Sequence, residues 1–298
     1  MVNSYRELKR TGIIRLGYPS DTYLHLLFKR GELLNNYLVT PEERESLQPS
    51  QWTEWIESAG DAYSKIMPLS SFGLFVSKLL ITSDGKKIEN FSKPNQLSEY
   101  IATLNKKPEP SLVQLNWEHA MGGVLFSGSQ KDSYSLFLSQ ETILDEAGIN
   151  KIFSQWNEPS CTVTTFVPDV SVDAWQEYYL RKSFADIYNR MLVRFEAMTG
   201  RALVDSLVRL IAIYVSNNNL EISISARKLV DLEVFSSPED AAQSYRQILT
   251  EMFSHVSAVL GSRLFALTLR EIMTSSPDQE RQVIRTFELF LEGYVYEK

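Results

Sequence analysis

The sequence changes character near residue 172, and this change limits the fold to two parts of different kinds. Residues 1–172 contain 10 of the 13 glycines and 9 of the 11 prolines, whereas residues 173–298 contain 3 and 2. Glycine and proline interrupt helices and shape turns. We therefore predict an α+β protein, with an N-terminal antiparallel β-meander region that includes helices over 1–172. A mostly α-helical bundle with a small β insert is expected over 173–298.

Two segments of the N-terminal part show the pattern of a three-stranded meander. The first, residues 11–42, alternates apolar and polar positions, and Gly31 can supply the positive φ of a tight hairpin turn. The second is residues 111–141, and a shift of 99 lays Leu16 on Leu115 and Leu26 on Leu125. An internal duplication is one interpretation. The alternative is chance, because any two antiparallel meanders alternate similarly.

The remaining N-terminal segments are shorter and less regular. Apolar side chains at helical spacing predict helices over Ser50–Lys65 and Asn95–Leu104, and Cys161–Val167 is expected to be a strand. Periodicity does not decide between helix and strand for Phe72–Ile81.

Long apolar stripes dominate the C-terminal part. Apolar residues recur every three or four positions from Asp173 and predict one long helix that ends at Gly200. The next stretch, Arg201–Val215, is apolar on most sides, so we expect it to be the central helix of the bundle. Ser237 is expected to cap a further helix.

Charge and composition exclude several classes of protein. The net charge is -4 for residues 1–172 and -3 for residues 173–298, so neither part has the basic field that nucleic-acid binding requires. Cys161 is the only cysteine, which excludes an intramolecular disulfide and fits a reducing compartment. No apolar run approaches about 18 residues. We expect a soluble cytoplasmic protein without membrane insertion.

Few residues are candidates for catalysis. Glu118 and His119 form the only adjacent acid and imidazole pair, and Cys161 could act as a nucleophile with His119. The alternative for Cys161 is a small buried residue at the start of a strand. Phosphate-binding and zinc motifs are missing, so no cofactor or metal is expected. On a strand, His25 should face away from Leu24 and Leu26, toward solvent or a partner.

Arginines along the first long helix are the candidates for an interaction surface. Arg181, Arg190 and Arg194 lie on this helix and could dock an acidic partner. A solvated helix face is the alternative.

One stretch resembles a known family. Thr11-Gly12-Ile13-Ile14-Arg15-Leu16, the apolar residues Leu24–Phe28 and the turn Gly31-Glu32-Leu33 are similar to the opening of PATAN-type bacterial signalling domains. The resemblance covers residues 11–40 only. It implies a regulatory or adaptor role through protein contacts, without enzymatic chemistry.

These observations lead to two hypotheses. The first is a non-catalytic regulatory or scaffold protein of bacterial signalling that acts through protein–protein contacts. Its partners are proteins, and a homodimer through the helical part is possible. The alternative is a small-ligand sensor or hydrolase with an interdomain pocket near His119 and Cys161.

Overall fold

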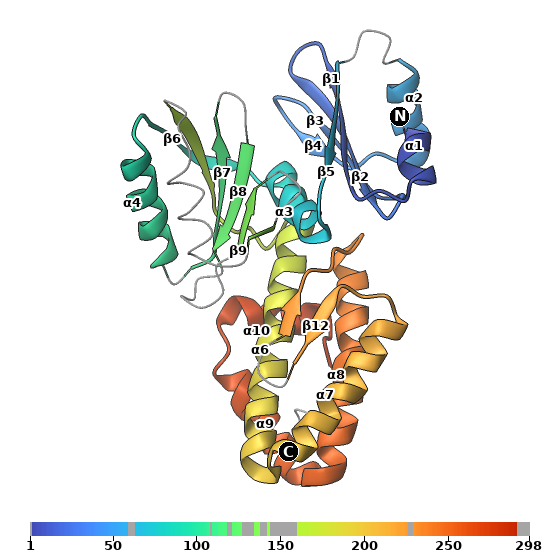
Figure 1. The fold of residues 1–298 in the computed structure, drawn as a ribbon, viewed down its shortest axis with the longest axis vertical. Helices are drawn as coiled ribbons and strands as arrows, with labels where there is room; N and C mark the ends of the chain where they lie inside the picture. Colours follow the sequence, from blue (N-terminus) through green and yellow to red (C-terminus); the bar gives the residue numbers. More distant parts are fainter. Residues whose placement is uncertain are drawn as a thin grey trace. The chain divides into compact units, whose positions relative to one another are not determined.

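The computed structural model of the chain describes residues 2–58, 63–107, 109–117, 121–126, 134–137, 142–143, 160–225 and 229–290. The chain divides into two compact units, Met1–Asp169 and Val170–Lys298. The first unit is built on two antiparallel sheets, and the second is mainly helical (Figure 1). The α+β class predicted from the sequence is confirmed.

A five-stranded antiparallel sheet, here called sheet A, forms the start of the first unit. Its strand order is β4-β3-β2-β1-β5. The strands are β1 (Gly12–Tyr18), β2 (Thr22–Lys29), β3 (Glu32–Val39), β4 (Arg44–Glu45) and β5 (Tyr63–Pro68). The turn between β2 and β3 has positive φ at both Arg30 and Gly31. This geometry matches the twist of the flanking strands, so the predicted hairpin is confirmed.

Two helices cover one face of sheet A, which we call its inner face. They are α1 (Val2–Glu7) and α2 (Pro49–Glu57). Ile14, Leu16, Leu24 and Leu26 of β1 and β2 are buried in one cluster against them. Because side chains alternate along a strand, the residues between these point to the opposite, outer face.

The second sheet, sheet B, has the strand order β10-β9-β8-β7-β11-β6. The strands are β6 (Gly85–Phe91), β7 (Ser111–Asn116), β8 (Met121–Phe126), β9 (Tyr134–Phe137), β10 (Thr142–Ile143) and β11 (Cys161–Phe166). Helix α4 (Pro94–Asn105) covers one face, and its Leu97, Ile101 and Leu104 share a core with β7 and β11. Figure 1 shows α4 lying along this sheet.

Helix α3 (Ser71–Thr82) lies in the chain between the two sheets and packs against β1, β8 and β9. Every residue from Ser71 to Leu79 is buried. Side chains are therefore covered on all sides of the helix, which explains why its apolar residues show no amphipathic period. The segment that periodicity left undecided, Phe72–Ile81, is thus a helix.

The two sheets share their connectivity. Strands β1 to β5 of sheet A lie in the same order as β7 to β11 of sheet B. A shift of 99 carries Leu16 onto Leu115, and it carries the β5 partner of Leu16, Ser64, onto Val163, which is the partner of Leu115 on β11. The agreement does not extend to the second strand, because Leu26 pairs with Ile14, whereas its match Leu125 pairs with Leu112 instead of Val113. The shared strand order fits a duplication but does not decide between duplication and chance. We call the two halves the first and second repeat.

One assignment in this unit was wrong, and one strand was missed. The predicted helix Ser50–Lys65 ends at Glu57, and Tyr63–Pro68 is a strand that pairs with β1. The apolar spacing fitted a helix, but hydrogen bonding to a neighbouring strand decided the outcome. Strand β6 was not predicted, because its residues Gly85–Phe91 are mostly polar and exposed.

The second unit is a helical bundle with a small hairpin. Its elements are α6 (Asp173–Thr199), α7 (Arg201–Asn217), β12 (Ile222–Ile224), β13 (Leu229–Asp231), α8 (Pro238–Leu260), α9 (Ser262–Thr274) and α10 (Asp278–Thr286). Helix α6 packs against α7, α8, α9 and α10. Large rings fill the interior, and Phe184 of α6 stacks on Tyr245 of α8 with ring centroids 4.5 Å apart. The predicted cap of α8 is confirmed, since the Ser237 hydroxyl accepts a hydrogen bond from the Asp240 N–H.

The expected central helix is not central. Helix α7 buries Val204, Leu207 and Ile211 but leaves Leu210 41% and Ile213 63% exposed. The longer α6 has the central position instead, because four other helices contact it. Apolar composition showed that α7 needs a neighbour, but it did not show how many of its sides are covered.

Candidate functional site

The structure does not bring the sequence-predicted catalytic residues together. Glu118 and His119 lie outside the described residues. Cys161 is the first residue of β11, is 4% exposed, and belongs to the core cluster between sheet B and α4. A thiol in apolar surroundings is a weak nucleophile, because burial disfavours the thiolate. Cys161 therefore fits the structural role better than the catalytic one.

The described histidines and acids do not form a metal site. Within residues 2–290, leaving out the masked segments, no three His, Cys, Asp or Glu side chains are placed to hold an ion. His25 lies on β2 and His255 on α8, in different units. As predicted, His25 faces away from Leu24 and Leu26, which belong to the inner core of sheet A. It does not face open solvent, because its Nδ1 atom is buried. In the same described part of the chain, no helix combines the length and apolarity that crossing a membrane requires.

Arg181 cannot contribute to an interaction surface, and here the sequence interpretation was wrong. This residue is only 6% exposed. Its guanidinium lies 3.7 Å from a carboxylate oxygen of Glu177 and 3.7 Å from one of Asp231, and it donates to the Glu233 carbonyl. Burial opposes the charge, but the Asp231 and Glu177 carboxylates and the Tyr245 hydroxyl outweigh it, so the pKa of Arg181 is raised.

The same acidic side chains also organise the backbone that follows β13. Glu177 accepts a hydrogen bond from the Phe235 N–H at 3.1 Å, and Glu233 accepts from the Glu221 and Val234 N–H groups at 2.8 and 3.0 Å. We call Glu177, Arg181, Asp231, Glu233 and Tyr245 the buried polar network. It fastens the hairpin and the segment 232–235 to α6, so its role is structural.

Arg190 and Arg194 are closer to the surface, but both already have partners within the bundle. Arg190 donates to the Asp186 carboxylate at 3.1 Å and to the Ile272 carbonyl at 3.2 Å. Arg194 forms an ion pair with Glu271 of α9, and both side chains are more than half exposed. These contacts hold α9 against α6. Docking of an acidic partner on these two residues stays a prediction.

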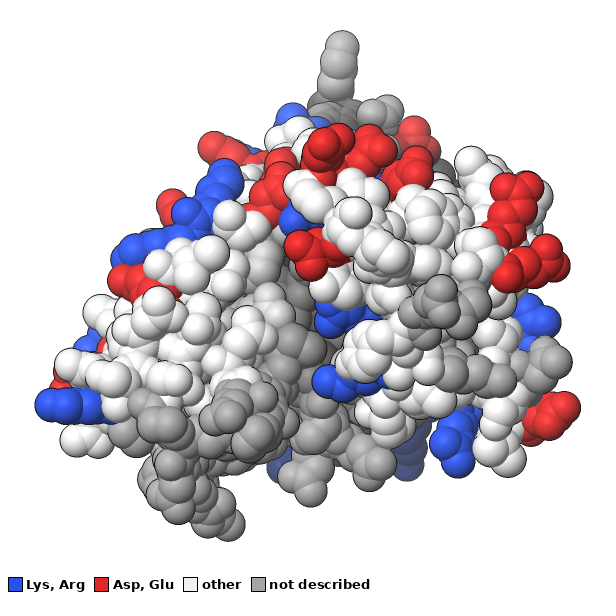
Figure 2. All heavy atoms as spheres, turned by 90° about the horizontal axis from the view of Figure 1, so that it is seen from above, with Lys and Arg blue, Asp and Glu red and all other residues white. Residues whose placement is uncertain are grey.

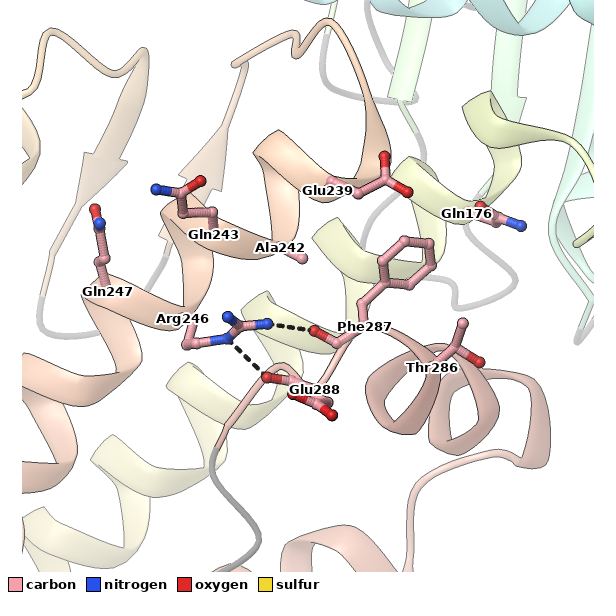
Figure 3. A pocket seen from close by; sticks show the side chains of 9 residues that line it. All are labelled: Gln176, Glu239, Ala242, Gln243, Arg246, Gln247, Thr286, Phe287 and Glu288. Carbon is pink, nitrogen blue, oxygen red and sulfur yellow. Dashed lines mark hydrogen bonds between the residues drawn. The ribbon is translucent and has the colours of Figure 1, made fainter.

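A polar pocket of about 820 Å³ lies in the helical unit between α6, α8 and the end of α10 (Figure 3). It is lined by Gln176, Glu239, Ala242, Gln243, Arg246, Gln247, Thr286, Phe287 and Glu288. Arg246 donates to the carbonyls of Phe287 and Glu288 at 2.6 and 2.8 Å. These carbonyls belong to the C-terminal end of α10, where helices leave acceptors without intrahelical partners. Arg246 is thus a helix cap.

The lining of this pocket offers binding groups and no reaction machinery. The Gln176 amide donates to the Val170 carbonyl, and the Gln247 amide accepts from the Tyr214 hydroxyl. In the view of Figure 3, the Phe287 ring lies between the Glu239 carboxylate and the Thr286 hydroxyl. The pocket can hold a polar ligand, but its side chains include no nucleophile with an adjacent base.

The outward edge of β5 is an open strand edge in the first unit. In sheet B, the matching strand β11 lies between β7 and β6. In sheet A, β5 pairs with β1 on one side, and no strand of the described residues pairs with it on the other. Five of the six β5 residues are exposed, including Tyr63 at 60% and Ile66 at 44%. Sequence reasoning placed Tyr63–Lys65 in the helix predicted over Ser50–Lys65 and missed this edge.

Charge is distributed in small groups. On the side seen in Figure 2, acidic and basic side chains stand in separate clusters among neutral residues.

Comparisons with family models, with curated proteins and with solved structures found no match to this chain.

Proposed function

We propose that this protein is a non-catalytic binding protein whose partner polypeptide adds a strand to the open edge of β5. A regulatory or scaffold role in the bacterial cytoplasm, which the PATAN resemblance and the single cysteine suggest, is part of the same proposal. The observation that carries it is that no strand of the described residues pairs with the outer edge of β5, at the position that β6 has beside β11 in the second repeat.

The second repeat indicates how such a partner would bind. Strand β6 runs antiparallel to β11 and pairs with it from Cys161↔Phe91 to Phe166↔Gly85. Strand β5 has the same position in the first repeat, and its outer side is exposed. Unpaired strand edges are templates for an added strand, whose affinity comes mainly from backbone hydrogen bonds. We therefore expect an extended, antiparallel segment.

The register identifies the backbone groups that would be used. The Leu69 N–H donates to the Thr11 carbonyl at 3.2 Å, immediately beyond the Gly12↔Pro68 pair. Because hydrogen-bonded and non-hydrogen-bonded pairs alternate in an antiparallel ladder, Ser64, Ile66 and Pro68 direct their backbone groups away from β1. Pro68 has no N–H, so the donors that point away from β1 are those of Ser64 and Ile66.

The test uses the full chain as bait in three forms: wild type, Ile66→Pro and Ile66→Val. Proline removes the outward N–H without breaking a bond to β1, and edge positions tolerate it. Valine keeps the N–H and most of the side chain, so it is the matched control. We expect quantitative mass spectrometry to show a partner that wild type and Ile66→Val retain and that Ile66→Pro loses at least tenfold.

Hydrogen exchange on the purified complex then locates the contact. The amides of Ser64 and Ile66 should exchange more slowly in the complex than in the free protein. The proposal fails if Ile66→Pro is folded by circular dichroism and still retains every partner, or if exchange at Ser64 and Ile66 does not change on binding.

A further inference from the structure

The outer face of sheet A carries a row of basic side chains across neighbouring strands. Lys65 of β5 lies opposite Arg15 of β1, and Arg15 lies opposite His25 of β2. These residues alternate with the inner core residues Leu16 and Leu24, so their side chains share the outer face. We call Lys65, Arg15 and His25 the basic row.

This arrangement works against stability unless something else binds there. Like charges directly opposite on adjacent strands repel each other. Neither Lys65 nor Arg15 forms an ion pair with a carboxylate among the described residues. Ion pairs do occur elsewhere in the unit, for example between Lys87 and Glu89. The basic row is therefore a local concentration of positive charge that an anion would relieve.

Two polar nitrogen atoms in the row are buried and lack a partner among the described residues. They are Nε of Arg15 and Nδ1 of His25. The Arg15 guanidinium lies 3.8 Å from the centre of the Tyr23 ring, which holds it in place over the face. Burial, with a smaller effect of Arg15, lowers the pKa of His25 to about 3. The imidazole is therefore neutral at pH 7. An anion bound beside it would favour its protonation.

The second repeat shows that the fold does not require these charges. At the positions matched by the shift of 99, Lys65 corresponds to Thr164 and Arg15 to Gln114. Gln114 pairs with Thr164 and with Gly123 across the same strands of sheet B. Neutral residues thus occupy the row in one repeat and basic residues in the other, although strand order is the same.

Aromatic rings lie in the next row of the same face. Gly17 pairs with Tyr63 of β5 and Tyr23 of β2. A Cβ at Gly17 would lie 3.2 Å from the Tyr63 ring and 3.4 Å from the Tyr23 ring, so the two rings approach each other over the glycine backbone. Tyr23 is engaged by Arg15, whereas Tyr63 is 60% exposed and offers a surface for stacking.

We propose that the basic row and Tyr63 bind a phosphate ester of a planar, aromatic group. The phosphate oxygens accept hydrogen bonds from Arg15 and Lys65, and its charge neutralises their repulsion. His25 contributes the third contact, and the planar group stacks on Tyr63. The site uses the face of β5, whereas a partner strand would use its edge, so the two proposals can fail independently.

Calorimetric titration of the full chain with phenyl phosphate, inorganic phosphate and phenol separates the contributions of phosphate and ring. We expect phenyl phosphate to bind best, inorganic phosphate several times more weakly and phenol not measurably. Arg15→Gln should weaken phenyl phosphate binding at least tenfold. Lys65→Thr should weaken it about two- to fivefold, because Lys65 is exposed. Both variants introduce the residue of the second repeat and should fold.

The matched control is Arg209→Gln, which removes an exposed arginine from the helical unit. It should change the Kd less than twofold. Sulfate, which keeps its double charge, tests the histidine: its binding should strengthen from pH 7 to pH 5 in the wild type and not in His25→Gln. The groups that face His25 on this side of the sheet are Arg15, Lys65, Tyr23 and Tyr37. Because the pKa of His25 is about 3 in the free protein, the gain at pH 5 requires that bound sulfate raises this pKa, and His25→Gln removes that effect.

The proposal is overturned if wild type does not bind phenyl phosphate at millimolar concentration. It is equally overturned if Arg15→Gln and Lys65→Thr both bind as wild type does, or if Arg209→Gln loses as much affinity as they do. Should Arg15→Gln unfold, the Lys65→Thr variant on the exposed edge strand decides the question.

Discussion

Replacing Arg181 by methionine is the most informative perturbation of the helical unit. Methionine fills much of the same space but removes the cation that lies 3.7 Å from both Glu177 and Asp231. These carboxylates are 0% and 2% exposed, so water cannot solvate them in place of the guanidinium. Removing one partner of a buried ion pair costs about 3–5 kcal/mol. A unit of ordinary stability, about 5–15 kcal/mol, would lose a large fraction of it.

Arg194→Met provides the matched control, because it makes the same substitution on the same helix. The Arg194 pair with Glu271 is exposed on both sides, at 52% and 60%, and such pairs contribute about 0–1 kcal/mol. The expected loss of stability for Tyr245→Phe lies between those of Arg181→Met and Arg194→Met. It keeps the ring stack on Phe184 but removes the hydrogen bond donated to Asp231, at a cost of about 1.5–3 kcal/mol.

Urea denaturation followed by circular dichroism measures the three free energies of unfolding. Hydrogen exchange locates the effect, because the N–H groups of Val234 and Phe235 are bonded to Glu233 and Glu177. We expect these two amides to lose protection in Arg181→Met and to keep it in Arg194→Met. A loss of stability in Arg181→Met no larger than that in Arg194→Met would refute the structural role of the buried polar network.

Three further predictions follow from single residues. The pKa of His25 is about 3 when folded and about 6.5 when unfolded, so its contribution is present above pH 6.5 and is lost as pH falls toward 3. Urea denaturation should show the first unit losing about 1.4 kcal/mol per pH unit below 6.5, and His25→Gln should remove this loss. Burial raises the pKa of Glu280 above 4.5 against the opposing effect of Lys182. Its contribution is therefore present below pH 4.5 and is lost as pH rises through the raised pKa, and Glu280→Gln should flatten that part of the stability profile of the helical unit. A Cβ at Gly12 would lie 2.2 Å from the Met67 carbonyl oxygen, whereas one at Gly200 meets nothing within 4 Å. Both have positive φ, so thermal unfolding should show Gly200→Ala losing about 1–2 kcal/mol and Gly12→Ala clearly more.

Elements with a regular pattern of their own could be predicted from the sequence. Apolar and polar residues alternate along β1 to β3, and Gly31 marks the turn between β2 and β3. Helix α6 has a long apolar stripe. Strand β5 could not be predicted, because its residues Tyr63–Pro68 continue the apolar spacing of α2 and become a strand only by pairing with β1. Strand β6 likewise depends on β11 for its structure.

The candidate sites depended even more on distant contacts. Arg181 was interpreted as a surface charge, since the sequence does not show that Asp231 and Glu233, 50 and 52 residues away, surround it. The direction of His25 could be derived from strand alternation alone. Its place in one row with Arg15 and Lys65 required the register of three strands, of which β5 comes from a more distant part of the chain.

Helix α3 has a consequence for how the first unit responds to strain. It is buried from Ser71 to Leu79 and contacts β1 of the first repeat as well as β8 of the second. A close-packed interior transmits displacement rather than absorbing it. A shift of β1 would therefore push this helix against β8. Helix α3 thus couples the two repeats mechanically.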